Sequence, residues 1–159
     1  YMWKWRVPAE AETPGGWSSA TVNVNPRWMR LAEVYLLGSE AHLMAGNQGK
    51  ADEYLNKVRG RAKASLKTGV KLADIQVEKR LELCGEGVRY QDLISWGIAA
   101  EKMKDQGKNC PLLDSNGNIE YKVYNTDANR FGFKEKHNLL PYPGVEIRPN
   151  PNIKQNPGW

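Results

Sequence analysis

The stretch that decides the fold runs from Trp28 to Gly97 and contains three periodic segments: RLAEVYLLGSEA (residues 30–41), LNKVRGRA (55–62) and EKRLELCGEGVRYQDLISWG (78–97). Apolar side chains recur there every three or four residues, a spacing that places them on one face of an α-helix. The pattern assigns to the buried faces Leu31, Val34, Tyr35, Ala41 and Ala45 in the first segment and Leu55, Val58 and Ala62 in the second. We therefore expect amphipathic helices that each bury one stripe.

Capping and turn residues divide this stretch into four helices. Asn25 can accept hydrogen bonds from free backbone N–H groups, Pro26 suits the first helical position, and Gly46-Asn47 ends the helix. The predicted helices cover residues 26–45, 49–64, 73–86 and 89–106. Because the first connection is short, the first two helices are expected to form an antiparallel hairpin. Gly38 and Ala41 on the packing side would allow a close approach.

The flanking segments follow other patterns. Residues 1–7 alternate apolar and polar side chains, which indicates a short strand, and Pro14-Gly15-Gly16 marks a turn just before Trp17. Asn116-Gly117, with alternating apolar residues after it, predicts a small β-hairpin. The remaining segment is proline-rich and should lie extended, anchored by Leu139, Leu140, Tyr142, Val145 and Ile153. The predicted organisation is mainly α: an aromatic arm and loop (1–25), helical hairpins (26–106), then a β-hairpin and extended tail (107–159).

Composition limits the possible function classes. With 159 residues, 40% of them hydrophobic and 26% charged, the chain fits one globular domain, and it has no apolar run of the roughly 20 residues that span a bilayer. The net charge is +5, with its densest surplus at Lys102, Lys104 and Lys108 and further lysines at Lys134 and Lys136. No nucleic-acid motif accompanies these lysines, so we expect no nucleic-acid partner, and a set that is solvated or faces an anionic surface.

Few residues offer catalytic or metal chemistry. Glu78, Glu82 and Glu86 share one helix face, but arginines surround them in sequence, so structural Arg–carboxylate pairs are the favoured interpretation. Two histidines and two cysteines supply neither a usual catalytic triad nor a zinc site. Asp114, Asn116 and Asn118 have the spacing of a calcium loop but lack its glycine and final glutamate, which favours a simple turn. Cys84 is expected as a small helix hydrophobe, with a bridge to Cys110 left open. We predict no enzyme activity, no metal and no cofactor.

At this point a family resemblance becomes visible. The three helical segments quoted above, read in order, resemble the C-terminal half of SusD/RagB-family proteins. The ending agrees: LPYPGVEI (residues 140–147), then NPNIKQNPGW (150–159), is similar to that family's closing segment, in which an aromatic residue follows Gln-Asn-Pro-Gly. Lys4-Trp5 also resembles a Lys-aromatic step of the family, whereas Ser39 and Tyr142 depart from its usual residues.

The resemblance implies a mainly α fold with tetratricopeptide-like helical hairpins. It also implies an outer-membrane lipoprotein on the cell surface that binds oligosaccharides, or peptides in some branches, and delivers them without catalysis to a SusC-type TonB-dependent transporter. Family members are several times longer, so we expect this chain to be their C-terminal portion. Attachment to the membrane would then depend only on a lipidated N-terminus that this chain does not contain.

The family fixes no ligand motif in this region, so the candidate binding residues rest on side-chain chemistry alone. Trp17 follows two glycines and could stack on the apolar face of a ligand, with Trp3 and Arg27 behind it, although Trp17 could equally fold back onto the helices. Two rival functions stay open. One is a protein-interaction scaffold that docks on the transporter, and the other is a glycoside hydrolase that uses Glu78 and Glu82. The hydrolase is disfavoured because two residues on one helix face could not flank a glycosidic bond.

Overall fold

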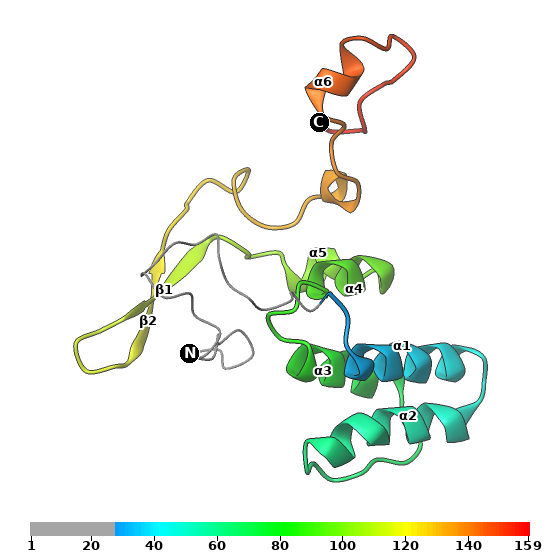
Figure 1. The fold of residues 1–159 in the computed structure, drawn as a ribbon. Helices are drawn as coiled ribbons and strands as arrows, with labels where there is room; N and C mark the ends of the chain where they lie inside the picture. The colour runs from blue at the N-terminus through cyan, green and yellow to red at the C-terminus, as the bar shows by residue number, and fades with distance from the viewer. Residues whose placement is uncertain (1–27) are drawn as a thin grey trace, which may run out of the picture. The chain divides into compact units, whose positions relative to one another are not determined.

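A computed structural model describes residues 28–159, and in this range the chain forms two compact units (Figure 1). The helical unit comprises the described residues up to Arg89, and the C-terminal unit comprises residues 90–159. Each is described by itself. Among residues 28–159, no helix combines the length and the apolar character that crossing a membrane requires.

Three helices build the helical unit: α1 (Leu31–Met44), α2 (Gln48–Arg61) and α3 (Leu72–Glu82). α1 and α2 lie side by side as an antiparallel hairpin across a three-residue connection, as the short predicted linker implied (Figure 1). Asn47 caps α2 by accepting a hydrogen bond from the N–H of Lys50 at 3.3 Å. The core of the unit consists of Leu36, Leu55, Val58, Val70, Ile75 and Leu83.

Small residues let the two helices of this hairpin approach closely. The ring of Tyr54 on α2 lies directly over Gly38 on α1, where a Cβ atom would come within 2.6 Å of Tyr54 Cδ2. At the next position of α1, the hydroxyl of the fully buried Ser39 donates a hydrogen bond of 2.8 Å to the carbonyl of Ala51. The prediction that Gly38 faces the neighbouring helix is therefore confirmed.

A carboxylate on α2 holds the loop that leads into α3. Asp52 accepts hydrogen bonds from the N–H groups of Gly69 and Val70, at 2.8 and 2.9 Å. Gln48 donates to the same carboxylate and to the carbonyl of Val70. These bonds fix the loop at the point where Val70 enters the core with 1% of its surface exposed.

The C-terminal unit consists of short elements: α4 (Arg89–Ser95), α5 (Ala99–Lys102), β1 (Asn109–Leu113), β2 (Ile119–Val123), the 3-10 helix η3 (Glu135–Asn138) and α6 (Gly144–Ile147). β1 and β2 form an antiparallel two-stranded sheet in which Leu113 pairs with Ile119 and Pro111 with Tyr121. Asp114 closes the turn by accepting hydrogen bonds from the N–H groups of Asn116 and Asn118. The predicted β-hairpin is thus confirmed, and so is the mainly α fold class.

Several helix boundaries predicted from sequence are wrong. α1 begins at Leu31, because Arg30 is still extended, and α3 ends at Glu82. The predicted helix 89–106 is interrupted after Ser95: Gly97 adopts a positive φ of 69°, and α5 begins only at Ala99. This left-handed backbone conformation ends an α-helix, and glycine is the residue that adopts it readily. The proline-rich tail also contains two single turns, η3 and α6, which the sequence did not predict.

The predicted buried face of α1 is correct only at Tyr35, which is partly buried against the core. Leu31 and Val34 are 64% and 47% exposed, and Ala41 and Ala45 are exposed as well. The helix instead packs through the face that holds Leu36 and Ser39. Two further sets of predictions fail in the same way. Ala62, the C-cap residue after α2, is exposed. The tail residues Leu139, Leu140, Tyr142 and Val145 are exposed too, so these four do not anchor the tail.

Candidate functional site

The binding residues predicted from sequence, Trp17, Trp3 and Arg27, lie outside the described residues. Their role stays a prediction. The described residues contain two arrangements of polar side chains that could carry function: the glutamate face of α3 and a hollow near the C-terminus.

Arginines neutralise the glutamate face of α3. Glu78 pairs with Arg59 of α2, and both side chains are largely buried. Glu82 accepts hydrogen bonds from Arg30 at 2.6 Å and from Arg61 at 2.7 Å. Arg30 also pairs with Glu86, and this hydrogen bond, followed by those to Glu82, raises the pKa of the guanidinium. The predicted structural Arg–carboxylate pairs are confirmed. Through these pairs the glutamates connect α3 and the residues after it to Arg30 and to α2.

The other candidate ligand groups also have simpler roles. Hydrogen bonds from the side chain and backbone of Asn118 lower the pKa of Asp114, whose carboxylate closes the hairpin turn. No group of three or more His, Cys, Asp or Glu side chains is arranged for a metal ion within residues 28–159. Cys84 and Cys110 are both free, and Cys84 is exposed beyond the end of α3, so its expected place as a helix hydrophobe is wrong.

The closing segment folds back on the residues before α6. Gln155 accepts a hydrogen bond from the N–H of Tyr142 and donates one to its carbonyl, at 2.9 and 3.0 Å. Asn156 donates to the carbonyl of Leu140 at 2.6 Å. The indole N–H of Trp159 lies 2.9 Å from each of two carbonyls, those of Lys136 and Leu139. The polar side chains of the Gln-Asn-Pro-Gly-Trp ending thus satisfy backbone groups that no helix or sheet would satisfy.

A line of aromatic side chains leads to this fold-back. The ring centroids of Tyr90 and Phe133 are 6.3 Å apart, those of Phe133 and His137 5.6 Å, and those of His137 and Trp159 5.6 Å. All three pairs are tilted or edge-on, the geometry that aromatic rings prefer. His137 Nδ1 accepts a hydrogen bond from the N–H of Lys134, which fixes the orientation of the imidazole.

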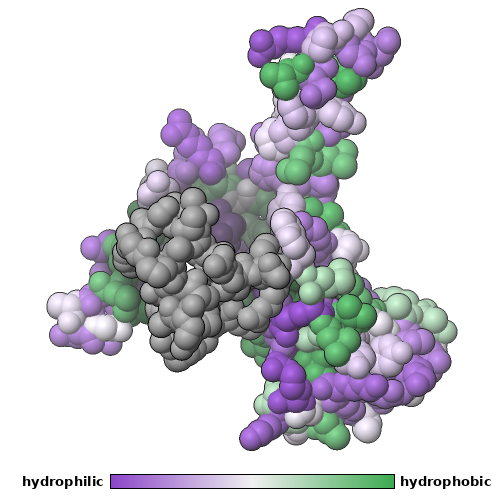
Figure 2. Space-filling view, viewed as in Figure 1, coloured by the Kyte–Doolittle hydropathy of each residue, from purple (hydrophilic) through white to green (hydrophobic). Residues whose placement is uncertain are grey.

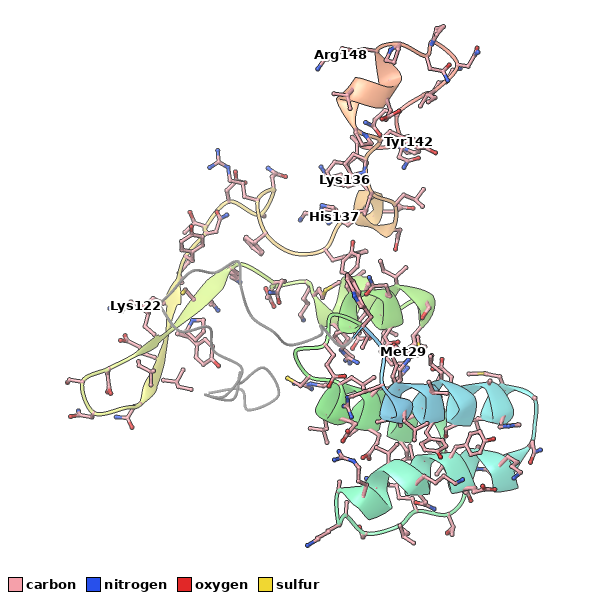
Figure 3. All side chains as sticks on the ribbon, viewed as in Figure 1. Met29, Lys122, Lys136, His137, Tyr142 and Arg148 are labelled. Carbon is pink, nitrogen blue, oxygen red and sulfur yellow. The ribbon has the colours of Figure 1, made fainter. Side chains whose placement is uncertain are left out.

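The fold-back borders an open hollow of about 530 Å³, which we call the C-terminal hollow. It is lined by Lys134, Glu135, Lys136, Asn138, Leu139, Pro157 and Gly158. Lys136 and His137 project from η3 beside it (Figure 3). Its volume lies in the range of about 300–1,000 Å³ that is usual for small-molecule sites. With charged groups, an amide and an apolar rim, the hollow can hold a polar organic ligand.

Sequence reasoning missed this hollow as a site. Lys134 and Lys136 stood out only as surplus charge, and Trp159 only as the end of the closing segment. The signal that could have found it is the pairing of Gln-Asn-Pro-Gly-Trp with the Leu-Pro-Tyr-Pro step 10 to 20 residues earlier. Periodicity does not report such a pairing, because it depends on side chain to backbone hydrogen bonds outside regular elements.

The paired helices, the small β-hairpin and the closing fold-back define a helical-hairpin protein of the tetratricopeptide-like class. The sequence model of the SusD family matches residues 1–159, and the chain belongs to that family. It is similar to the SusD-like protein P25 of Formosa agariphila, with 34% identity in an alignment 136 positions long that covers 80% of this chain and 23% of the relative.

Solved structures agree with this membership. A SusD-like protein from Bacteroides fragilis matches with a TM-score of 0.66 and 25% identity, over 83% of this chain and 25% of that one. A surface glycan-binding protein A from Bacteroides uniformis matches with a TM-score of 0.62 and 30% identity, over 86% and 28%. The chain therefore spans about a quarter of the length of these relatives.

Proposed function

We propose that this chain is part of a non-catalytic cell-surface protein that binds an oligosaccharide nutrient and delivers it to a SusC-type TonB-dependent transporter in the outer membrane. Membership of the SusD family, together with 30% identity to a surface glycan-binding protein, supports this proposal most strongly. Attachment of the parent protein to the membrane would occur through a lipidated N-terminus.

The glutamates of α3 support the non-catalytic part of the proposal. A glycosidase needs two carboxyl groups on opposite sides of the scissile bond. Glu78 and Glu82 lie on one helix, and each is paired with arginine. Their side chains are only 8% and 9% exposed, so they are poorly placed to reach a sugar.

The ligand would be held by stacking on aromatic rings and by hydrogen bonds from side chains. Trp17, with Trp3 and Arg27, is the candidate platform outside the described residues. The C-terminal hollow is the candidate within them. Both kinds of group suit sugars, because a pyranose ring has an apolar face for stacking and hydroxyl groups at its rim for hydrogen bonds.

The test is isothermal titration of the 159-residue chain against plant, host and microbial oligosaccharides, with tryptophan fluorescence recorded alongside. We expect binding with quenched fluorescence, and a loss of about five- to tenfold in affinity for Trp17→Ala, since one aromatic stacking contact is worth about 1–1.5 kcal/mol. Tyr124→Ala, which removes an exposed aromatic ring from the hairpin end, serves as the matched control. Unchanged affinity in Trp17→Ala would move the site elsewhere, and no binding by a folded sample would refute glycan binding by this portion.

One observation favours a second function, a tetratricopeptide-like scaffold that docks on the transporter. The outer face of α1 exposes Leu31, Val34, Leu37 and Met44, and apolar surface is visible over the helical unit (Figure 2). A helix that is apolar on both faces usually packs on both sides. Co-purification with a membrane barrel, without affinity for any glycan, would favour this function. Titration with peptides would distinguish a peptide ligand from a glycan.

A further inference from the structure

We propose that the C-terminal hollow is a subsite for an acidic sugar, whose carboxylate or sulfate group pairs with the ammonium of Lys136 beside Trp159. This inference rests on the proposed function and adds a substrate class and a location to it. Four features of the described residues carry it: an ordered lysine, an unbalanced charge, a fixed aromatic ring and a hollow of suitable size.

Lys136 is held in place along its whole side chain. Its stem packs against Gly158, where an added Cβ would lie 2.8 Å from Lys136 Cβ and 3.4 Å from Cδ. Its ammonium lies 4.3 Å from the centroid of the Trp159 ring, within cation–π distance. A lysine that is already ordered loses little conformational entropy when it binds an anion, so more of the interaction free energy contributes to affinity.

The charge of the hollow favours an anion. Two lysines, Lys134 and Lys136, and one glutamate, Glu135, line it, which gives a net charge of +1. Among the described residues, Lys136 has the indole ring as its charge-stabilising contact and no carboxylate within 4.0 Å. Lys134 donates a hydrogen bond at 2.7 Å to the carbonyl of Ala128, which is an uncharged partner. A ligand carboxylate or sulfate would therefore accept a charge-assisted hydrogen bond from the ammonium of Lys136.

The remaining groups suit the sugar ring. Trp159 does not line the hollow itself but follows the lining residue Gly158; its indole N–H donates to two backbone carbonyls, and the residue is 45% exposed. Leu139 and Pro157 add apolar surface, and the amide of Asn138 offers polar contacts for hydroxyl groups. At about 530 Å³, the hollow has room for one or two sugar rings.

The experiment compares ligands that differ only in charge. Trigalacturonate, its uncharged methyl ester, and a sulfated and an unsulfated galactotriose are titrated into the 159-residue chain at low and high salt. We expect both anionic ligands, or one of them, to bind at least tenfold more tightly than the matched neutral form. High salt should reduce this preference because it screens a partly exposed charge. Comparison of the galacturonate pair with the galactotriose pair identifies whether the hollow prefers a carboxylate or a sulfate group.

Lys136→Met tests the residue itself, since methionine keeps most of the stem that packs on Gly158. We expect about a tenfold loss of affinity for the acidic ligand, as for one charge-assisted hydrogen bond, and unchanged affinity for neutral ligands. Lys122→Met on β2 removes the same charge from an exposed position of the hairpin and should leave binding unchanged (Figure 3). Thermal unfolding of each variant checks that it is folded, and Lys136→Gln repeats the test with a polar replacement.

Two outcomes would overturn the inference. Equal affinity for the acid and its methyl ester would exclude a charge-specific subsite. An acidic preference that survives in both Lys136 variants would place the subsite away from the hollow. In either case, binding of neutral oligosaccharides would leave the proposed function standing, whereas no binding by any glycan would exclude glycan binding by this portion and the acidic subsite with it.

Discussion

Gly38 on α1 lies against the ring of Tyr54 on α2. Replacing it with alanine would place a Cβ atom 2.6 Å from Tyr54 Cδ2 and 2.8 Å from Cε2, well inside van der Waals contact. Tyr54 is packed against Tyr35 and His42, so its ring has little freedom to move away. We expect Gly38→Ala to lower the free energy of unfolding by about 1–3 kcal/mol, the usual cost of overpacking, as measured by urea denaturation.

Gly60, near the end of α2, provides the control for this substitution. A Cβ atom there would meet no other atom within 4 Å. Alanine at this helical position should keep stability or raise it by up to about 1 kcal/mol, because alanine has the higher helix propensity. If Gly38→Ala were as stable as Gly60→Ala, the close approach of the two helices would not depend on glycine.

Asp52 makes the stability of the helical unit depend on pH. The N–H of Val70, then the side chain of Gln48 and the N–H of Gly69, donate hydrogen bonds that lower the pKa of this carboxyl group in the folded state. The charged form therefore stabilises the fold above the unfolded pKa of about 4, and this contribution is lost as the pH falls through the lower folded pKa.

Asp52→Asn should accordingly destabilise the protein at pH 7 and destabilise it less at pH 3. Because Asp52 is partly exposed, we expect a difference of only about 1 kcal/mol in the free energy of unfolding. Urea denaturation of both proteins at the two pH values measures it. A difference that did not change with pH would mean that the amide loses packing or geometry rather than charge.

At the scale of elements, the sequence predicts the helices well and their faces less well. α1 is apolar on both sides, so the spacing of Leu31, Val34 and Ala41 fits a buried stripe as well as that of Leu36 and Ser39 does. Only packing against α2 decides between them, and the small residues Gly38 and Ser39 determine that packing. Periodicity carries no information on which of two apolar faces meets a neighbour.

Local signals were reliable where one residue controls the backbone. Asn116-Gly117 correctly predicted the hairpin turn, and Gly117 does adopt a positive φ of 82°. Gly97, by contrast, was included within a helix because the apolar spacing continues on both sides of it. The arginines around the glutamates of α3 also allowed their pairing to be predicted, since long opposite charges on packed helices find each other. The C-terminal hollow could not be predicted, because backbone carbonyls of irregular residues hold Trp159.

At the scale of the whole molecule, the two units differ in how much they bury. The helical unit contains a core with four side chains exposed by 1% or less, Leu36, Leu55, Val70 and Ile75. In the C-terminal unit, nearly all residues of β1 and β2 are exposed, including Leu113, Ile119, Tyr121 and Val123. A two-stranded sheet without a covered face is marginally stable in water. The two units should therefore open independently and at different free energies.

Native-state hydrogen exchange of the 159-residue chain tests this difference. We expect the amides of Leu36, Leu55 and Ile75 to exchange at least a hundredfold more slowly, after correction for intrinsic rates, than the paired amides of β1 and β2. The helical amides open only when the core is disrupted, whereas the hairpin amides open when the strands separate. Equal protection would contradict independent opening, because the hairpin would then need a covering surface as extensive as the core of the helical unit. An oligosaccharide that binds in the C-terminal hollow should slow amide exchange selectively around Lys136 and Trp159. The reason is that binding stabilises only the states in which the hollow is intact.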